Sequence, residues 1–229
     1  MSLRTLLVAG SLAVAGVATA APPFEDTIAQ RVLACTGCHG DSGRAGPDGY
    51  YPRIAGKPAG YLHHQLLHFR DGRRRYPLMA HLVAPLTDTY LREMADHFAA
   101  LDVPYPPPST APLRGLAARG EELVRQGDPV RGVPACQACH GERLTGVAPA
   151  IPGLLGLPRD YLNAQFGAWR TGKRRAFAPD CMHVVAERLD LPDIDAVSSW
   201  LASQPVPVPS KAADALPGPL PMACGGVAK

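Results

Sequence analysis

The sequence predicts an all-α protein built from two tandem domains of similar design. One five-residue pattern occurs twice, beginning at residues 35 and 136, and matching residues recur after each copy at an offset of 100. Phe69-Arg70-x-Gly72, for example, corresponds to Trp169-Arg170-x-Gly172. Apolar residues recur at helical spacing, and the sequence lacks a convincing alternation of the kind that predicts strands. These observations indicate a duplicated helical unit of about 90 residues.

The repeated pattern is Cys-x-x-Cys-His, present as Cys35-Thr36-Gly37-Cys38-His39 and Cys136-Gln137-Ala138-Cys139-His140. Two cysteines three positions apart share one face of a helical turn, so their sulfurs can bond to the two vinyl groups of one porphyrin. The histidine that follows lies under the ring and can ligate the iron. The motifs therefore predict two covalently bound haem c groups, attached through Cys35, Cys38, Cys136 and Cys139, with His39 and His140 as iron ligands. A structural zinc site with four cysteine ligands is the less favoured alternative.

The first 20 residues have the pattern of a secretory signal peptide. Arg4 supplies the positive charge, Leu6–Val17 is apolar, and Ala18-Thr19-Ala20 is a small-x-small cleavage site. The apolar run is too short for a membrane span, and no other segment of the sequence approaches one. We therefore expect cleavage near Ala20 and a periplasmic mature protein, in the compartment where bacteria attach haem to such motifs.

The remaining chain divides by composition and by the repeat. We expect domain 1 at residues 21–102 and domain 2 at residues 113–204. A proline-rich linker at 103–112 joins them, and a Pro/Gly-rich tail at 205–229 follows. Because proline-rich linkers are extended and semi-rigid, this one should hold the domains at short range.

Helices are predicted on both sides of each motif. Residues 27–33 and 115–126 should be helical and precede the two motifs. Thr87 is a candidate N-cap for the last helix of domain 1. Pro192 falls in the first turn of the corresponding helix in domain 2, where proline is tolerated.

Each iron needs a second axial ligand from elsewhere in its domain. Met79 and Met182 occupy equivalent places, each seven residues before a leucine at the start of the last helix. We favour these methionines over the neighbouring His81 and His183, which would give haems of lower potential. The other methionines and histidines are assigned to core packing, to the tail, or to partly exposed surface and satisfied core: Met94, Met222, His63, His64, His68 and His97.

The sequence resembles the di-haem class I cytochromes c of the cytochrome c4 type over nearly all of the mature chain. The resemblance rests on the two motifs, the paired methionines, Pro52-Arg53-Ile54-Ala55-Gly56-Lys57 and Tyr61-Leu62-His63-His64-Gln65-Leu66. It implies two class I cytochrome c domains, each wrapped around a covalent haem, that pass electrons between respiratory partners in the periplasm. It also implies the axial pairs His39/Met79 and His140/Met182. Finally, it implies that the carbonyls of Pro52 and Pro152 accept hydrogen bonds from Nδ1 of the two histidines.

The sequence departs from this family pattern near the second methionine. Three residues separate Arg75 from Met79, but six separate Arg175 from Met182, and the extra length includes Cys181. The tail supplies a further cysteine, Cys224. Three interpretations stand: two free thiols, a Cys181–Cys224 disulfide, or Cys181 as an axial thiolate, as in di-haem thiosulfate dehydrogenases. We favour the disulfide because an exported protein occupies an oxidising compartment.

Charge says little about the partner. The formal net charge of +3 on 229 residues excludes a strong field for nucleic acid. Two local basic clusters, 73–75 and 173–175, fit three interpretations: a solvated turn, pairing with haem propionates, or docking of an acidic partner.

Two classes of function remain at this stage. The favoured one is an electron carrier between redox proteins such as quinol–cytochrome c reductase, a terminal oxidase or a periplasmic dehydrogenase. The alternative is a di-haem enzyme or enzyme subunit that oxidises inorganic sulfur compounds, such as a thiosulfate dehydrogenase or the cytochrome subunit of a sulfide dehydrogenase. The sequence offers no catalytic constellation of Ser/His/Asp or paired carboxylates, which favours the carrier.

Overall fold

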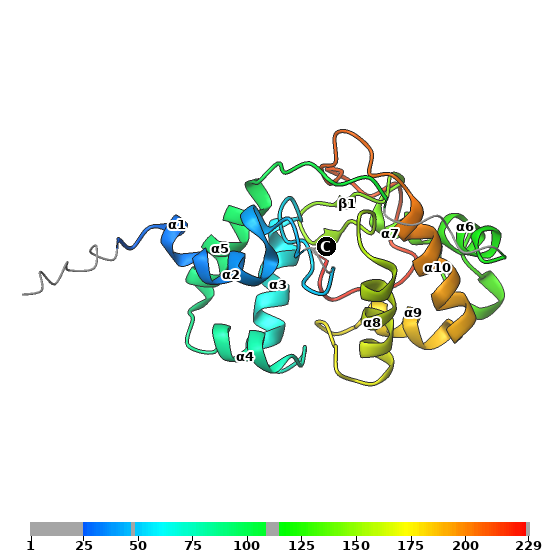
Figure 1. The fold of residues 1–229 in the computed structure, drawn as a ribbon. Coiled ribbons are helices and arrows are strands. Elements are labelled where there is room, and N and C mark those ends of the chain that lie inside the picture. Colours follow the sequence, from blue (N-terminus) through cyan, green and yellow to red (C-terminus); the bar gives the residue numbers. More distant parts are fainter. Residues whose placement is uncertain (1–24, 47–48, 109–114, 228–229) are drawn as a thin grey trace, which may run out of the picture.

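The computed structural model describes residues 25–46, 49–108 and 115–227, so the predicted signal peptide lies outside the described residues. Two helical domains lie side by side, and a tail returns over the second (Figure 1). Domain 1 contains five α-helices and one 3-10 turn: α1 Ile28–Arg31, α2 Leu33–His39, η1 Asp41–Gly43, α3 Ala59–Arg70, α4 Pro77–Val83 and α5 Asp88–Ala100.

Domain 2 repeats the order of the α-helices, but its 3-10 turn precedes the motif helix instead of following it, and it has one addition. Its helical elements are α6 Ala117–Arg125, η2 Pro129–Arg131, α7 Cys136–His140, α8 Arg159–Arg170, α9 Cys181–Arg188 and α10 Leu191–Ser203. The addition is a short antiparallel pair, β1 Gly146–Val147 with β2 Ile151–Pro152, in register Gly146↔Pro152. Strands of two residues are too short to produce the alternation on which strand prediction depends, so no sequence pattern indicated them.

The last helices of the two domains begin where the cap residues predict. The Thr87 side chain accepts a hydrogen bond from the N–H of Tyr90, which confirms it as the N-cap of α5. Asp190 caps α10 in the same way, and Pro192 lies in the first turn of that helix. The helices predicted before the motifs are also confirmed, although α1 is a single turn and α2 then continues through the first motif itself.

Each domain has its own core. In domain 1, α3 packs on α5 around two clusters, which include Leu62 and Phe98 in one and Phe69 and Leu91 in the other. In domain 2, α10 packs on α6 and α8 around a single larger cluster centred on Trp200. Because each cluster draws its buried residues from one repeat only, the two repeats are separate packing units. The domain boundaries drawn from the sequence stay a prediction.

A reciprocal backbone contact joins the two domains. Residues 73–75 run antiparallel to residues 173–175, with Arg74 opposite Arg174. Two hydrogen bonds of equal length, 2.7 Å, close the contact: Arg75 N–H to Lys173 O, and Arg175 N–H to Arg73 O. Nearby, α3 approaches residue 149 so closely that a Cβ on Gly60 would lie 2.7 Å from the carbonyl oxygen of Pro149. Glycine is therefore the residue that this approach permits.

Arg53 holds the start of the linker against domain 1. Its guanidinium donates hydrogen bonds to the carbonyls of Val103 and Pro104 and lies 3.8 Å from the centre of the Tyr105 ring. These contacts keep the described part of the linker close to the first domain, as a semi-rigid linker requires.

The tail runs back over domain 2 toward the domain boundary (Figure 1). Ala213 exchanges backbone hydrogen bonds with Gly146 and Ala148, which extends the short β pair. Farther on, Cys224 is bonded to Cys181 at the start of α9. These contacts fix the tail to domain 2.

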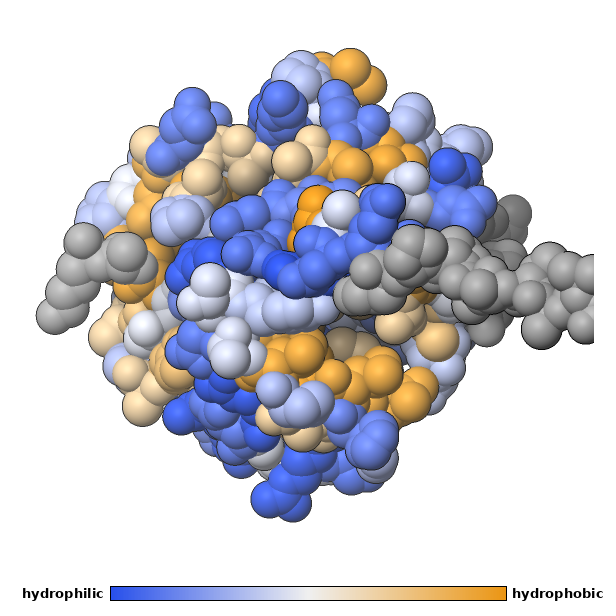
Figure 2. All heavy atoms as spheres, turned by 90° about the vertical axis from the view of Figure 1, so that its left-hand side faces the viewer, coloured by the Kyte–Doolittle hydropathy of each residue, from blue (hydrophilic) through white to orange (hydrophobic). Residues whose placement is uncertain are grey.

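The outer face of domain 1 carries exposed apolar side chains. Figure 2 shows polar and apolar residues interspersed over this end, with apolar residues gathered in its lower half, where α4 lies. Leu78 and Leu82 of α4 are exposed there, and Leu33 is exposed at the start of α2. Among the described residues, no helix is both long enough and apolar enough to cross a membrane.

Candidate functional site

The two Cys-x-x-Cys-His motifs lie on the helical turns that their chemistry requires. The first occupies the end of α2 and the second forms the whole of α7. His39 and His140 are buried, and Nδ1 of each lies 2.7 Å from a proline carbonyl oxygen, Pro52 and Pro152 respectively. The two hydrogen bonds implied by the family resemblance are thus confirmed.

These hydrogen bonds determine what the imidazoles can do. A carbonyl can only accept, so Nδ1 of each ring must carry the proton and Nε2 keeps its lone pair. Burial lowers the pKa of both histidines, and the bonds to the proline carbonyls oppose that shift. Both rings therefore present a neutral, oriented Nε2, which is the form that ligates a metal.

The motif cysteines lie in apolar surroundings. Burial raises the pKa of Cys35 to about 11 and that of Cys136 to about 12. Cys35 contacts the Leu62–Phe98 cluster of domain 1, and Cys136 contacts the core of domain 2. Within the described ranges, the structure brings no three His, Cys, Asp or Glu side chains into a metal-binding group, whereas the zinc alternative needs four ligands.

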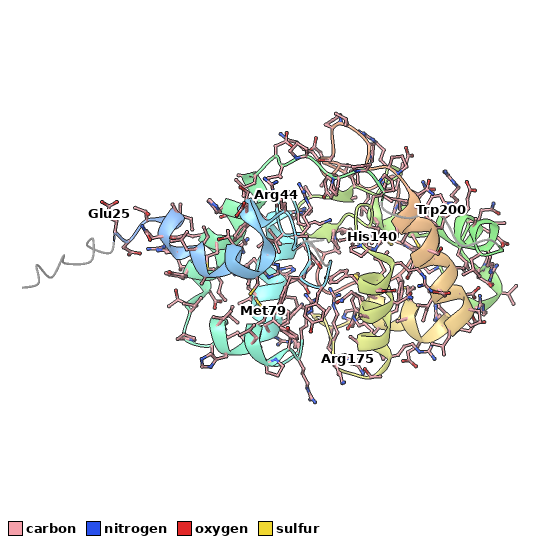
Figure 3. The ribbon with its side chains drawn as sticks, in the orientation of Figure 1. Glu25, Arg44, Met79, His140, Arg175 and Trp200 are labelled. Atoms are coloured by element: carbon pink, nitrogen blue, oxygen red, sulfur yellow. A yellow bond between two sulfur atoms is a disulfide. The ribbon has the colours of Figure 1, made fainter. Side chains whose placement is uncertain are left out.

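Met79 and Met182 lie at equivalent places on short helices. Met79, on α4, contacts the Phe69–Leu91 cluster, and Met182, on α9, contacts the same cluster as Cys136. Figure 3 shows Met79 on α4 in domain 1 and His140 on α7 in domain 2. Of the rival ligands, His81 is exposed and His183 is half-buried.

The interface carries two arginines arranged by an approximate twofold relation. Arg74 donates to Gln65 and Gln165 at 3.0 and 2.8 Å, and Arg174 donates to the same two glutamines at 3.1 and 2.7 Å. Each also reaches the tyrosine hydroxyl of the opposite domain at 3.4 Å: Tyr161 for Arg74, and Tyr61 for Arg174.

Arg174 and its surroundings fit the carboxylates of a haem. Arg174 is 5% exposed, its hydrogen-bond acceptors are neutral, and burial followed by the nearby Arg74 lowers its pKa. The guanidinium lies 3.9 Å from the centre of the Trp169 ring, whose buried Nε1–H has no hydrogen-bond partner. A buried cation beside an unpaired donor is stabilised by an anion, and each haem c brings two propionates.

Cys181 and Cys224 form a disulfide, as favoured from the sequence. The two cysteines are 43 positions apart, so the bond stabilises the folded chain by about 4 kcal/mol in the chain-entropy model. The sulfur of Cys181 is therefore engaged, and the free-thiol and thiolate-ligand alternatives do not match this structure.

The histidines of α3 differ from what the sequence suggested. His63 and His68 are buried, 6% and 2% exposed, rather than lying on the surface. The satisfied-core alternative is wrong for His68, because its Nδ1 is buried without a hydrogen-bond partner. The sequence carried no signal for one cause of this burial: the rings of His64 and His68 pack edge-on against Phe177, which belongs to the other domain.

Comparison with known proteins identifies the family. The chain is 38% identical over 196 residues, 86% of both chains, to the thiosulfate dehydrogenase electron acceptor of Thiomonas intermedia (strain K12). It superposes on the structure of reduced recombinant cytochrome c4 from Pseudomonas stutzeri with a TM-score of 0.63 and 30% identity, over 76% of this chain and 94% of that one. The chain belongs to the di-haem cytochrome c4 family. Its members are all-α electron-transfer proteins with two covalently bound haem c groups, and this chain is one of them.

A third comparison concerns a longer protein. The "as isolated" form of thiosulfate dehydrogenase (TsdBA) from Marichromatium purpuratum matches with a TM-score of 0.65 and 35% identity over 75% of this chain. This chain covers only 36% of that chain, so the activity of the whole protein does not carry over. No family model matches the sequence.

Proposed function

We propose that this protein is a periplasmic electron carrier that accepts electrons from a thiosulfate dehydrogenase and passes them to a respiratory redox partner. The observation that carries the proposal is the 38% identity, over 86% of both chains, with a thiosulfate dehydrogenase electron acceptor. Oxidative coupling of two thiosulfate ions releases two electrons, and two haems on one chain can take up both.

Each haem, when bound, supplies one-electron exchange between ferric and ferrous iron. The chain's own residues set the conditions for that exchange. Nε2 of His39 and His140 would bind the irons, held in orientation by the Pro52 and Pro152 carbonyls. Met79 and Met182 are the proposed further ligands, whose thioether sulfur would favour the ferrous state and raise the potential.

The domain interface brings the two electron sites into a fixed relation. The backbone ladder and the Arg74/Arg174 network join the domains at their centre. Arg174 and Trp169 Nε1 are the proposed partners of haem propionates, which would neutralise the buried guanidinium and occupy the unpaired indole N–H.

The enzyme alternative has less support. It depends on Cys181 as a thiolate ligand, as in thiosulfate dehydrogenases, and that sulfur is bonded to Cys224. Donors other than thiosulfate dehydrogenase, such as quinol–cytochrome c reductase, remain compatible with an electron carrier, and so does a terminal oxidase as acceptor.

Stopped-flow spectroscopy tests the proposal. The oxidised di-haem protein is mixed with thiosulfate and a catalytic amount of purified thiosulfate dehydrogenase, and reduction is followed at the haem α-band. We expect both haems to be reduced with the enzyme present and neither with thiosulfate alone. Reduction by thiosulfate alone would establish the enzyme alternative. If the enzyme does not reduce the haems and quinol–cytochrome c reductase reduces them rapidly, the electron donor is the reductase and not a thiosulfate dehydrogenase.

The proposed location has its own test. If residues 1–20 are a signal peptide, the protein purified from a periplasmic extract should begin at Ala21, as read by N-terminal sequencing. Its intact mass should exceed that of the mature chain by two haems that resist acid–acetone extraction.

A further inference from the structure

The loop before α9 reaches across the domain boundary. Phe177 belongs to the segment that is three residues longer in domain 2 than in domain 1. Its ring lies edge-on against two histidines of α3, with centroids 5.0 Å from His64 and 4.6 Å from His68. The guanidinium of Arg73 lies 5.1 Å from the same ring. The half-buried Phe177 of domain 2 thus contacts three side chains of domain 1.

The same loop is held from behind by the tail. The disulfide joins Cys181 to Cys224, and the next residue, Gly225, donates its N–H to the carbonyl of Pro179 at 2.9 Å. Gly226 then lies beside the His64 ring of domain 1. The loop is therefore bonded to the tail and also contacts domain 1.

The loop is also closed on itself at the start of α9. One carboxylate oxygen of Asp180 accepts the N–H of Ala176 at 2.7 Å, and the other accepts the N–H of His183 at 3.1 Å. Phe177 and Met182 both lie within the segment 176–183 that these two hydrogen bonds close. A displacement of Phe177 should therefore also displace Met182.

We propose that Phe177 and the Cys181–Cys224 disulfide form an interdomain clasp that positions Met182 in its own domain and fixes domain 2 against domain 1 for electron transfer between the haems. The inference deepens the proposed function, since it assigns positioning roles within the electron path, and it rests on Met182 as the proposed ligand. It does not rest on the identity of the electron donor.

The clasp contains one bond that solution chemistry can open. A dithiol reductant breaks the sulfur–sulfur bond, each cysteine sulfur takes up one electron and one proton, and the dithiol is oxidised to its own disulfide. Opening the bond removes the covalent link between the tail and the loop, which leaves the loop with its non-covalent contacts: the Asp180 hydrogen bonds, the Gly225–Pro179 hydrogen bond and the packing of Phe177.

Two variants of the holo-protein separate the two parts of the clasp. Cys181→Ser/Cys224→Ser removes the tether behind the loop, and Phe177→Ala removes the contact with domain 1. Val208→Ala is the matched control, because Val208 lies on the same tail but is 93% exposed. Methionine methyl resonances of the ferrous protein report each iron–sulfur bond separately, and calorimetry reports whether the domains unfold together.

The expected results differ between the variants. Cys181→Ser/Cys224→Ser should keep both haems but lose the Met182 resonance at a temperature lower by about 5 °C or more, while the Met79 resonance is unchanged. Phe177→Ala should keep both resonances at 25 °C, slow haem-to-haem electron transfer after flash reduction by about tenfold, and split unfolding into two transitions. Treating the parent with a dithiol should reproduce the double-serine result, and Val208→Ala should match the parent.

Several outcomes would overturn the inference. One is a double-serine variant with the parent's Met182 resonance at every temperature. Another is a Phe177→Ala variant with the parent's electron-transfer rate and a single transition. A parent protein without a Met182 resonance would refute the ligand and with it the positioning role. The donor assay above is independent of all these measurements, so its failure would leave the clasp standing.

Discussion

The two helices that carry the proposed methionine ligands are anchored in different ways. In domain 1, α4 begins at Pro77 after Tyr76, which makes no side-chain cap hydrogen bond, and the helix is held mainly by packing on the Phe69–Leu91 cluster. In domain 2, α9 has a capping aspartate, a disulfide and a longer preceding loop. The two repeats thus place their proposed methionine ligands on equivalent helices, but different contacts hold those helices in place.

The two proposed ligands therefore depend on different parts of the molecule. Met79 packs on the core of domain 1, so a change in that core can disturb it. Met182 packs on the core of domain 2 and depends in addition on segments outside that core: the tail, and the α3 face of the other domain. The domains should therefore respond differently to the same class of perturbation.

Removal of the methionines themselves should have the largest effect. Met79→Ala and Met182→Ala should each open one iron to carbon monoxide and lower the potential of that haem only, because the thioether favours the ferrous state. Redox titration should show one shifted wave, and carbon monoxide titration should show one binding site per protein. The Met222→Ala variant serves as a control and should bind none. If either methionine variant leaves both waves in place, that methionine is not a ligand.

The next effect concerns the interface. Arg174 is buried and lies over Trp169, whereas Arg74 is half-buried and lies 4.6 Å from the Phe69 ring. We expect Arg174→Met to lower the free energy of unfolding by about 3 kcal/mol, because it leaves the glutamine and tyrosine acceptors with fewer donors.

Arg74→Met should cost about half as much, since water can replace part of its hydrogen bonding. Denaturation by urea, followed at the two haem bands, measures both values. Equal losses for the two variants would mean that burial does not distinguish the two arginines.

The haem motifs, the paired methionines, the disulfide and the cap of α5 could be predicted from the sequence. Motif spacing predicted the haem attachment residues, the equal distance of Met79 and Met182 from a leucine at the start of the last helix paired them, and two unassigned cysteines in a chain expected to be exported pointed to the disulfide. These features depend on local spacing or on pairs of rare residues, which a sequence displays directly. The cap at Thr87 is of the same kind.

The interface could not be predicted in the same way. Arg74 and Arg174 were visible only as basic clusters, because a network that joins two repeats depends on how the repeats dock. His63 and His68 follow a helical pattern that is compatible with either surface or core. The packing of His68 against Phe177 comes from an insertion whose direction the sequence does not specify.

Acid should act on domain 1 through His68. Burial lowers its pKa to about 4, with Arg73, His64 and Arg174 acting in the same direction and Asp180 opposing them. The unfolded chain takes up a proton below about pH 6.5, whereas the folded chain keeps the ring neutral to about pH 4. The contribution of His68 to stability is therefore complete above pH 6.5 and falls as the pH is lowered through this window, by about 3 kcal/mol in all.

Domain 2 has no titrating group at the equivalent position, which is Ala168. Urea denaturation of the parent from pH 7 to 4 should therefore show the loss that His68 causes. His68→Ala should lower stability at pH 7 and flatten the pH profile. A profile that keeps its slope in this variant would assign the effect to another group.

The smallest expected effect concerns the N-cap of α9, which α4 lacks. Asp180→Ala removes the cap of α9 together with the bond to the Ala176 N–H, and a lost N-cap lowers stability by about 1 kcal/mol. Because the disulfide still holds the loop, we expect Met182 to stay on its iron at 25 °C and to dissociate a few degrees earlier on heating. Thr87→Ala, which removes the cap of α5, is the matched change in domain 1 and should leave the Met182 transition in place.

The far-red methionine–iron band, followed with temperature in both variants, measures these transitions. If Asp180→Ala lowers the Met79 transition equally, the domains melt as one unit and the cap is not specific to the second iron. If only the Met182 transition moves, the second ligand has an anchor that the first lacks.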